Sequence, residues 1–250
     1  NDADGDGEND TATKSKSVSK DGGGKIASFT KNLKTCFSSS TLAYVVISLL
    51  LFGWVSRTTS YANMASFYEE KYGIEPHYRG YIKSYQQGLN FLVQSFFVRA
   101  LLSASGGERK AARFACIILA FATLCEVNAN FQVFLVLVCP AVAVSVGTIG
   151  VSLRSILTQV TPKESIGSVL AALDVLQNAA SVTVPFYRTL LFNLVACCGV
   201  TDEDAAMAGD PDPKAWLLSS FLHWTVFAVA ITFLLLPDLP SGRDADKKNR

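Results

Sequence analysis

Polar and charged side chains form a single helical stripe within one long apolar segment. Lys83, Gln87, Asn90 and Gln94 are spaced at i, i+4, i+7 and i+11, with Gln86 beside them. Residues at this spacing share one face of an α-helix. Ammonium and amide groups on one face of an apolar helix can hydrogen-bond a polar solute or line a water-filled cavity. We therefore treat this stripe as candidate binding surface.

A second apolar segment repeats the spacing with Asp174, Asn178, Ser181, Pro185 and Arg188. Acids within apolar segments often exchange protons, because an unused charge there is costly. Asp174 is therefore the best candidate for a titrating group. The serines and threonines of these segments have a simpler interpretation, which we favour, as hydrogen bonds between helices.

Arg154 and Asp174 stand at similar predicted depths in neighbouring segments. At a rise of about 1.5 Å per residue, they lie about 7 Å and about 13 Å from the expected inner ends of their helices. We expect a gating salt bridge between them that breaks when a cavity opens inward. A permanent structural ion pair explains the same placement equally well.

Three cations share the outer third of their segments by the same count: Arg57, Lys83 and Arg188. Their counter-charges could come from Glu69, Glu126 or an absent part of the protein. An anionic substrate is the remaining alternative.

Catalytic, metal and cofactor sites are not predicted. The only histidines are His77 and His223, and neither belongs to a Ser or Asp motif. The six cysteines form no C-x-x-C pair, so they are interpreted as small apolar residues. We expect no enzyme activity and no cofactor.

The composition indicates a membrane protein. Hydrophobic residues make up 50% of the 250 residues and charged residues 17%, against about 25% charged in soluble domains. A net charge of +1 gives no electrostatic reason for a nucleic-acid partner. The apolar residues occur in six blocks long enough to cross about 30 Å of lipid as helices, since spanning backbone must satisfy its own hydrogen bonds. The blocks cover 39–63, 79–103, 111–127, 130–158, 166–197 and 215–236.

Two hydrophilic segments flank the predicted six-helix bundle of residues 39–236. Residues 1–38 are rich in Asp, Gly, Ser and Lys, so we expect a disordered cytoplasmic loop or tail. Residues 237–250 are expected to form a cytoplasmic tail. The polar leader, without an initial Met or a signal sequence, suggests a piece of a longer protein.

Lysine and arginine counts predict the orientation. With the first tail in the cytoplasm, the inner segments carry fourteen Lys and Arg residues and the outer loops carry three. Because cytoplasmic loops are enriched in these residues, both ends are expected to be cytoplasmic. Four predicted spans, the first, second, fourth and fifth, are polar on one face, which predicts a cavity between them. The third and sixth are expected to be peripheral supports.

Three stretches resemble the major facilitator superfamily. Residues 79–88 resemble the start of the eighth span in those transporters. The inner loop 105–113 is similar to the degenerate C-terminal copy of their Gly/Asp/Arg loop motif. Residues 153–170 look like the junction of the tenth and eleventh spans in the tetracycline-antiporter and organic-cation-transporter-like branch.

This resemblance covers residues 41–236 and implies the C-terminal six-helix half of a transporter. It implies that the N-terminal half of the same protein and the lipid bilayer are partners. The implied activity is secondary transport of a small solute by alternating access, with proton coupling left open. The expected cavity residues are Arg57, Lys83, Gln87, Asn90, Gln94, Asp174, Asn178 and Arg188. The alternative is a non-transporting scaffold or receptor that keeps the fold.

Overall fold

A computed structural model describes residues 33–34, 36–37, 39–59, 67–197 and 213–235. Its elements are helices throughout, and these residues contain no strand. Their bounds are α2 Ser40–Thr59, α3 Phe67–Tyr72, η2 Pro76–Tyr78, α4 Arg79–Leu92, η3 Val93–Phe97, α5 Val98–Ser105, α6 Glu108–Val127, α7 Phe131–Val133, η4 Phe134–Val138, α8 Cys139–Val160, η5 Lys163–Ser165, α9 Ile166–Cys197, α11 Pro213–Val229 and η6 Ala230–Leu235.

The predicted helical segments are confirmed as helices. The fifth apolar block coincides with α9, and the second, third, fourth and sixth blocks match their helices to within three residues at each end. The first block is helical over α2, and its last residues, 60–63, lie outside the described part of the chain. So do the tails predicted at 1–38 and 237–250, except for four residues between Leu33 and Phe37.

Within the described residues, four helical segments are long and apolar enough to cross a membrane, which indicates a membrane protein. They are 40–59, 131–160, 163–191 and 214–232. The run α4–η3–α5 and the helix α6 fall short of this criterion. The physical reason is the polar stripe in the first of them and the charges in the second, which begins with Glu108, Arg109 and Lys110 and has Glu126 near its end.

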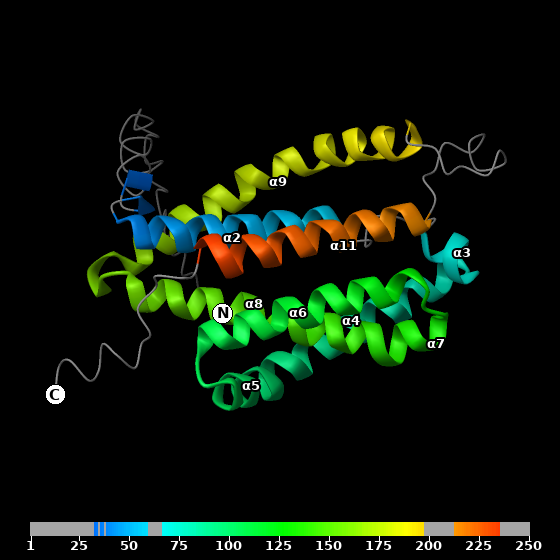
Figure 1. The fold of residues 1–250 in the computed structure, drawn as a ribbon, viewed down its shortest axis with the longest axis horizontal. Helices are drawn as coiled ribbons and strands as arrows, with labels where there is room; N and C mark the ends of the chain where they lie inside the picture. The colour runs from blue at the N-terminus through cyan, green and yellow to red at the C-terminus, as the bar shows by residue number, and fades with distance from the viewer. Residues whose placement is uncertain (1–32, 35, 38, 60–66, 198–212, 236–250) are drawn as a thin grey trace, which may run out of the picture.

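The long helices form two rows. In the first row α9 contacts α2, α2 contacts α8, and α8 contacts α4. Behind this row α6 packs against α8, and α11 packs against both α6 and α2. Figure 1 shows α9 at one edge of the bundle and α5 at the opposite edge.

Neighbouring helices run in directions that their contacts define. The Trp54 indole donates a hydrogen bond to Thr183, and one turn later α2 accepts a hydrogen bond from Arg188. Both contacts advance in the same direction along the two helices, so α2 and α9 run parallel. Gln86 meets Cys139, and Val93 meets Gly147, so α4 and α8 also run parallel. Glu108 at the start of α6 instead contacts Gln159 near the end of α8, which makes these two helices antiparallel.

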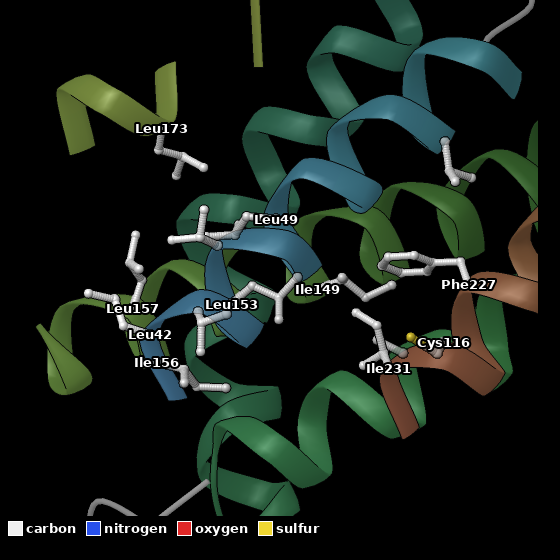
Figure 2. Packing of buried hydrophobic residues seen from close by; sticks show 14 of the residues in the cluster. Leu42, Leu49, Cys116, Ile149, Leu153, Ile156, Leu157, Leu173, Phe227 and Ile231 are labelled. Carbon is white, nitrogen blue, oxygen red and sulfur yellow. The ribbon is translucent and has the colours of Figure 1, made fainter. Parts of the chain in front are cut away.

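The core lies where α2 and α8 meet their neighbours. Leu42 and Leu49 of α2 pack with Ile149 and Leu153 of α8, and Leu173 comes from α9. Figure 2 shows these side chains converging, with Cys116 of α6 and Ile231 of η6 on the other side of the cluster. Close approach is assisted by Gly150, because a Cβ there would lie 3.4 Å from the Phe52 ring.

Candidate functional site

A half-open pocket of about 250 Å³ lies between the two rows of helices. Its apolar wall includes Phe134 and Val138 of η4, Val142 and Val146 of α8, and Trp224 of α11. Its polar wall combines hydroxyl, amide and carboxyl groups from four helices. These polar residues are Ser56, Thr59, Gln86, Asn90, Thr123, Glu126 and Ser220.

Glu126 is the acid of this pocket. Its side chain is 3% exposed, and its Oε1 atom has no hydrogen-bond partner among the residues that the structure describes. The neighbouring Thr123 hydroxyl donates instead to the backbone oxygens of Leu119 and Ala120. A buried carboxyl oxygen without a donor costs free energy, so Glu126 is a feature that needs an explanation.

Lys71 of the short helix α3 lies next to this acid. Its Nζ donates a hydrogen bond to the backbone oxygen of Glu126, and it lies over the Tyr72 ring. Burial lowers the pKa of Lys71, while the Glu126 charge opposes that shift. No ion pair within 4 Å joins the Lys71 ammonium to the Glu126 carboxylate among the described residues, since the ion pairs found there are Glu69 with Arg79 and Glu75 with His77.

Arg57 and Arg188 form hydrogen bonds between α2 and α9. Arg188 Nε donates to the Thr58 backbone oxygen over 3.1 Å, and its Nη2 donates to the backbone oxygen of Arg57. Arg57 Nη1 donates to the Gln177 backbone oxygen over 3.0 Å. The last carbonyls of a helix lack intrahelical partners and attract cations, so Arg188 caps α2. This removes most of the reason to invoke an anionic substrate for these two cations.

A further polar chain joins α9 to α11. The Tyr187 hydroxyl lies 2.7 Å from His223 Nε2, and His223 Nδ1 lies 2.6 Å from the Ser219 backbone oxygen. The carbonyl can only accept, so His223 Nδ1 is the donor in its contact with Ser219. Trp54 packs on the Tyr187 ring at 4.7 Å. Sequence reasoning missed this chain, because Tyr187 and His223 are 36 residues apart and lie on different helices.

The stripe residues of α4 and η3 divide between pocket and surface. Asn90 lines the pocket and is half-buried. Lys83, Gln87 and Gln94 are exposed on the isolated chain. Gln94 lies beside Gly147, which places the inner part of the stripe next to α8.

On α9, Asp174 and Asn178 are also exposed. Arg154 is exposed on α8, and the structure contains no ion pair between Arg154 and Asp174 in its described part. Helix α2 lies between α8 and α9 in the row. The gating pair therefore stays a prediction.

The walls of this pocket differ from those expected for the cavity, which itself stays a prediction. The third and sixth apolar segments were expected to be peripheral, but α6 supplies Thr123 and Glu126, and α11 supplies Ser220 and Trp224. Helix α9, which was expected to contribute, supplies no lining residue. Glu126 and Gln86 were visible in the sequence as polar residues in apolar segments, but neither was among the expected cavity residues.

The serines of α8 turn inward. Ser145, Thr148 and Ser152 are buried, and the Ser145 hydroxyl donates to Ala141 of its own helix. They do not make the expected hydrogen bonds between helices, because Ser145 bonds its own helix and the Thr148 and Ser152 hydroxyls have no partner among the described residues.

Comparisons with protein-family models, with curated proteins and with solved structures find no match to this chain.

Proposed function

We propose that this chain is a six-crossing bundle that forms one half of a secondary transporter of the major facilitator type. The observation that carries the proposal is the exposed polar stripe of Lys83, Gln87 and Gln94 on a helical run packed against a membrane-spanning helix. Polar and charged side chains within membrane-spanning helices are costly and rarely face lipid. Such a stripe is therefore expected to face water or another part of the protein.

Six crossings are supported by how α4–η3–α5 and α6 lie beside α8. The run α4–η3–α5 continues for 27 residues, which is about 40 Å of helix, and α6 for 20 residues, or about 30 Å. Both lie alongside α8, which is itself long and apolar enough to span. A helix that packs along the length of a membrane-spanning helix is expected to cross the bilayer beside it.

The outward face of α6 supports the same proposal. Phe114, Ile117, Phe121 and Leu124 follow helical spacing and are 57%, 64%, 64% and 44% exposed. A continuous apolar face of this kind is expected against lipid tails rather than water. At the start of α4, Tyr78 and Tyr81 are exposed, as in the aromatic belts at membrane surfaces.

The exposed polar face also suggests the partner. A second six-span half of the same protein would cover Lys83, Gln87 and Asp174 and enclose a solute near the bilayer midplane. The lysine and arginine distribution supports a cytoplasmic location for both ends of this half. In this arrangement Asp174 is the proposed proton carrier and pairs with Arg154 when the inner side is closed.

Transport by the natural protein that contains this chain, reconstituted in liposomes, tests the proposal. We expect saturable uptake of at least one solute from a broad panel, and accumulation driven by an imposed pH gradient. Asp174→Asn should abolish accumulation but leave solute exchange without a gradient, because exchange needs no net proton movement. The matched variant Glu164→Gln, at an exposed loop position, should behave as the unmodified protein.

Correctly inserted protein that moves no solute on the panel would contradict the transporter proposal and favour a scaffold or receptor. Uptake that responds to pH equally in Asp174→Asn and in the unmodified protein would reject only the role of Asp174.

A further inference from the structure

The pocket between the two rows of helices is lined by one acidic residue and by no basic residue. Of its lining residues, Glu126 is an acid, and none is Lys, Arg or His. The Glu126 side chain is 3% exposed, and no donor among the described residues reaches its Oε1 atom. A carboxylate in such a place needs a counter-charge or a donor to offset its desolvation.

The backbone adds negative potential at the same place. Helix α2 ends at Thr59 and α6 ends at Val127, and Thr59 and Glu126 both line the pocket. The C-terminal end of a helix carries about half a negative charge. Two such ends and one acid therefore meet at one wall, although Arg188 offsets part of the α2 contribution.

The opposite wall suits a cation as well. Trp224 and Phe134 line it, and aromatic faces attract cations by about 0.5–2 kcal/mol. Hydroxyl and amide oxygens of Ser220 and Asn90 are available as uncharged acceptors.

We propose that this pocket binds a small monovalent cation, with the Glu126 carboxylate as its counter-ion. One acid is too few for a divalent ion, which usually takes several carboxylates, and the described residues contain no cluster of three metal-ligating side chains. A pocket of about 250 Å³ has room for a hydrated alkali ion or a small protonated amine. Both share a single positive charge and a preference for oxygen ligands.

In this proposal the Lys71 ammonium competes with the bound cation for the negative charge of Glu126. This ammonium group stands next to Glu126 but is bonded to the backbone oxygen, so the carboxylate Oε1 is left for another cation. Removal of the Lys71 charge should therefore strengthen cation binding. The inference goes beyond transport, because binding in the pocket requires neither a gradient nor a second half of the protein.

Calorimetric titration of the 250-residue chain in detergent tests the proposal. The probes are sodium, potassium and methylammonium chloride, and N-methylglucamine chloride keeps the ionic strength constant. We expect saturable binding of at least one probe. Selectivity for sodium or potassium identifies an alkali-ion site, and selectivity for methylammonium identifies an amine site.

Two variants give opposite expected shifts. Glu126→Gln keeps the shape of the side chain and should weaken binding about tenfold or more, because it removes a charge in direct contact. Lys71→Gln keeps a donor for the Glu126 backbone oxygen and should tighten binding about threefold to tenfold. Glu164→Gln is the matched control and should bind as the unmodified chain does.

The proposal is overturned if no probe binds saturably to the unmodified chain, or if Glu126→Gln binds as well as the unmodified chain. Weaker cation binding by Lys71→Gln would also contradict the proposal, because weaker binding is expected if Lys71 only maintains the shape of the pocket. These outcomes differ from a failure of solute transport, which calorimetry does not measure.

Discussion

Replacing Leu153 by Ala should lower the free energy of unfolding by about 2–4 kcal/mol. Leu153 is fully buried on α8 and belongs to the cluster in which α2, α8 and α9 meet. Lipid tails are as apolar as leucine, so association of helices in a bilayer depends on packing rather than on transfer from water. The expected loss therefore comes from the contacts that the truncated side chain no longer makes.

Unfolding of the chain in mixed micelles with increasing SDS gives this free energy. Leu190→Ala is the matched control, because Leu190 is 55% exposed on α9 and should cost about 0.5 kcal/mol or less. Equal losses for the two variants would mean that Leu153 does not lie in a packed core.

Replacing Arg188 by Leu should cost about 2–4 kcal/mol, because its guanidinium makes charge-assisted hydrogen bonds to two carbonyls of α2. Those carbonyls end a helix and would lose their donors in surroundings with little water. The interface between the parallel helices α2 and α9 should weaken first, because the hydrogen bond from Trp54 to Thr183 lies in the same seam between the two helices. Helix α9 contacts few other helices, so this seam holds it in place.

The same SDS titration measures the effect, with Arg99→Leu as the control at an exposed position of α5. We expect the control to change stability by about 0.5 kcal/mol or less. If Arg188→Leu lowers the free energy of unfolding no more than the control does, Arg188 is not a structural cap of α2. An anionic solute would then again be a candidate partner for its charge.

The helices could be predicted from the sequence because each one is encoded locally. The apolar block at 166–197 sets the bounds of α9 despite Pro185 within it. The polar stripe of Lys83, Gln87, Asn90 and Gln94 was likewise visible from spacing alone. Both features depend on residues within a few turns of each other.

The candidate site could be predicted only in part, because its contacts join distant residues. Arg188 and Thr58 are 130 positions apart, and no local pattern shows that α2 and α9 lie side by side and share this bond. Glu126 stands near the end of an apolar segment, where the sequence is equally consistent with exposure at the surface. Its burial follows from α2, α4 and α11 closing around it. The π-helical segments η3, η4 and η6 have no local sequence signal that we recognise.

The six-crossing arrangement is tested most directly by the side of the membrane on which residue 110 lies. Cysteine is introduced separately as Lys110→Cys, Glu75→Cys and Glu164→Cys, all at exposed positions. Each variant is labelled in intact cells with a membrane-impermeant maleimide, before and after permeabilisation, and the signal of the unmodified chain is subtracted. If α4–η3–α5 and α6 cross the bilayer, Lys110→Cys labels with Glu164→Cys and opposite to Glu75→Cys. If only the four most apolar segments cross, Lys110→Cys labels together with Glu75→Cys, and the proposed half-transporter is contradicted.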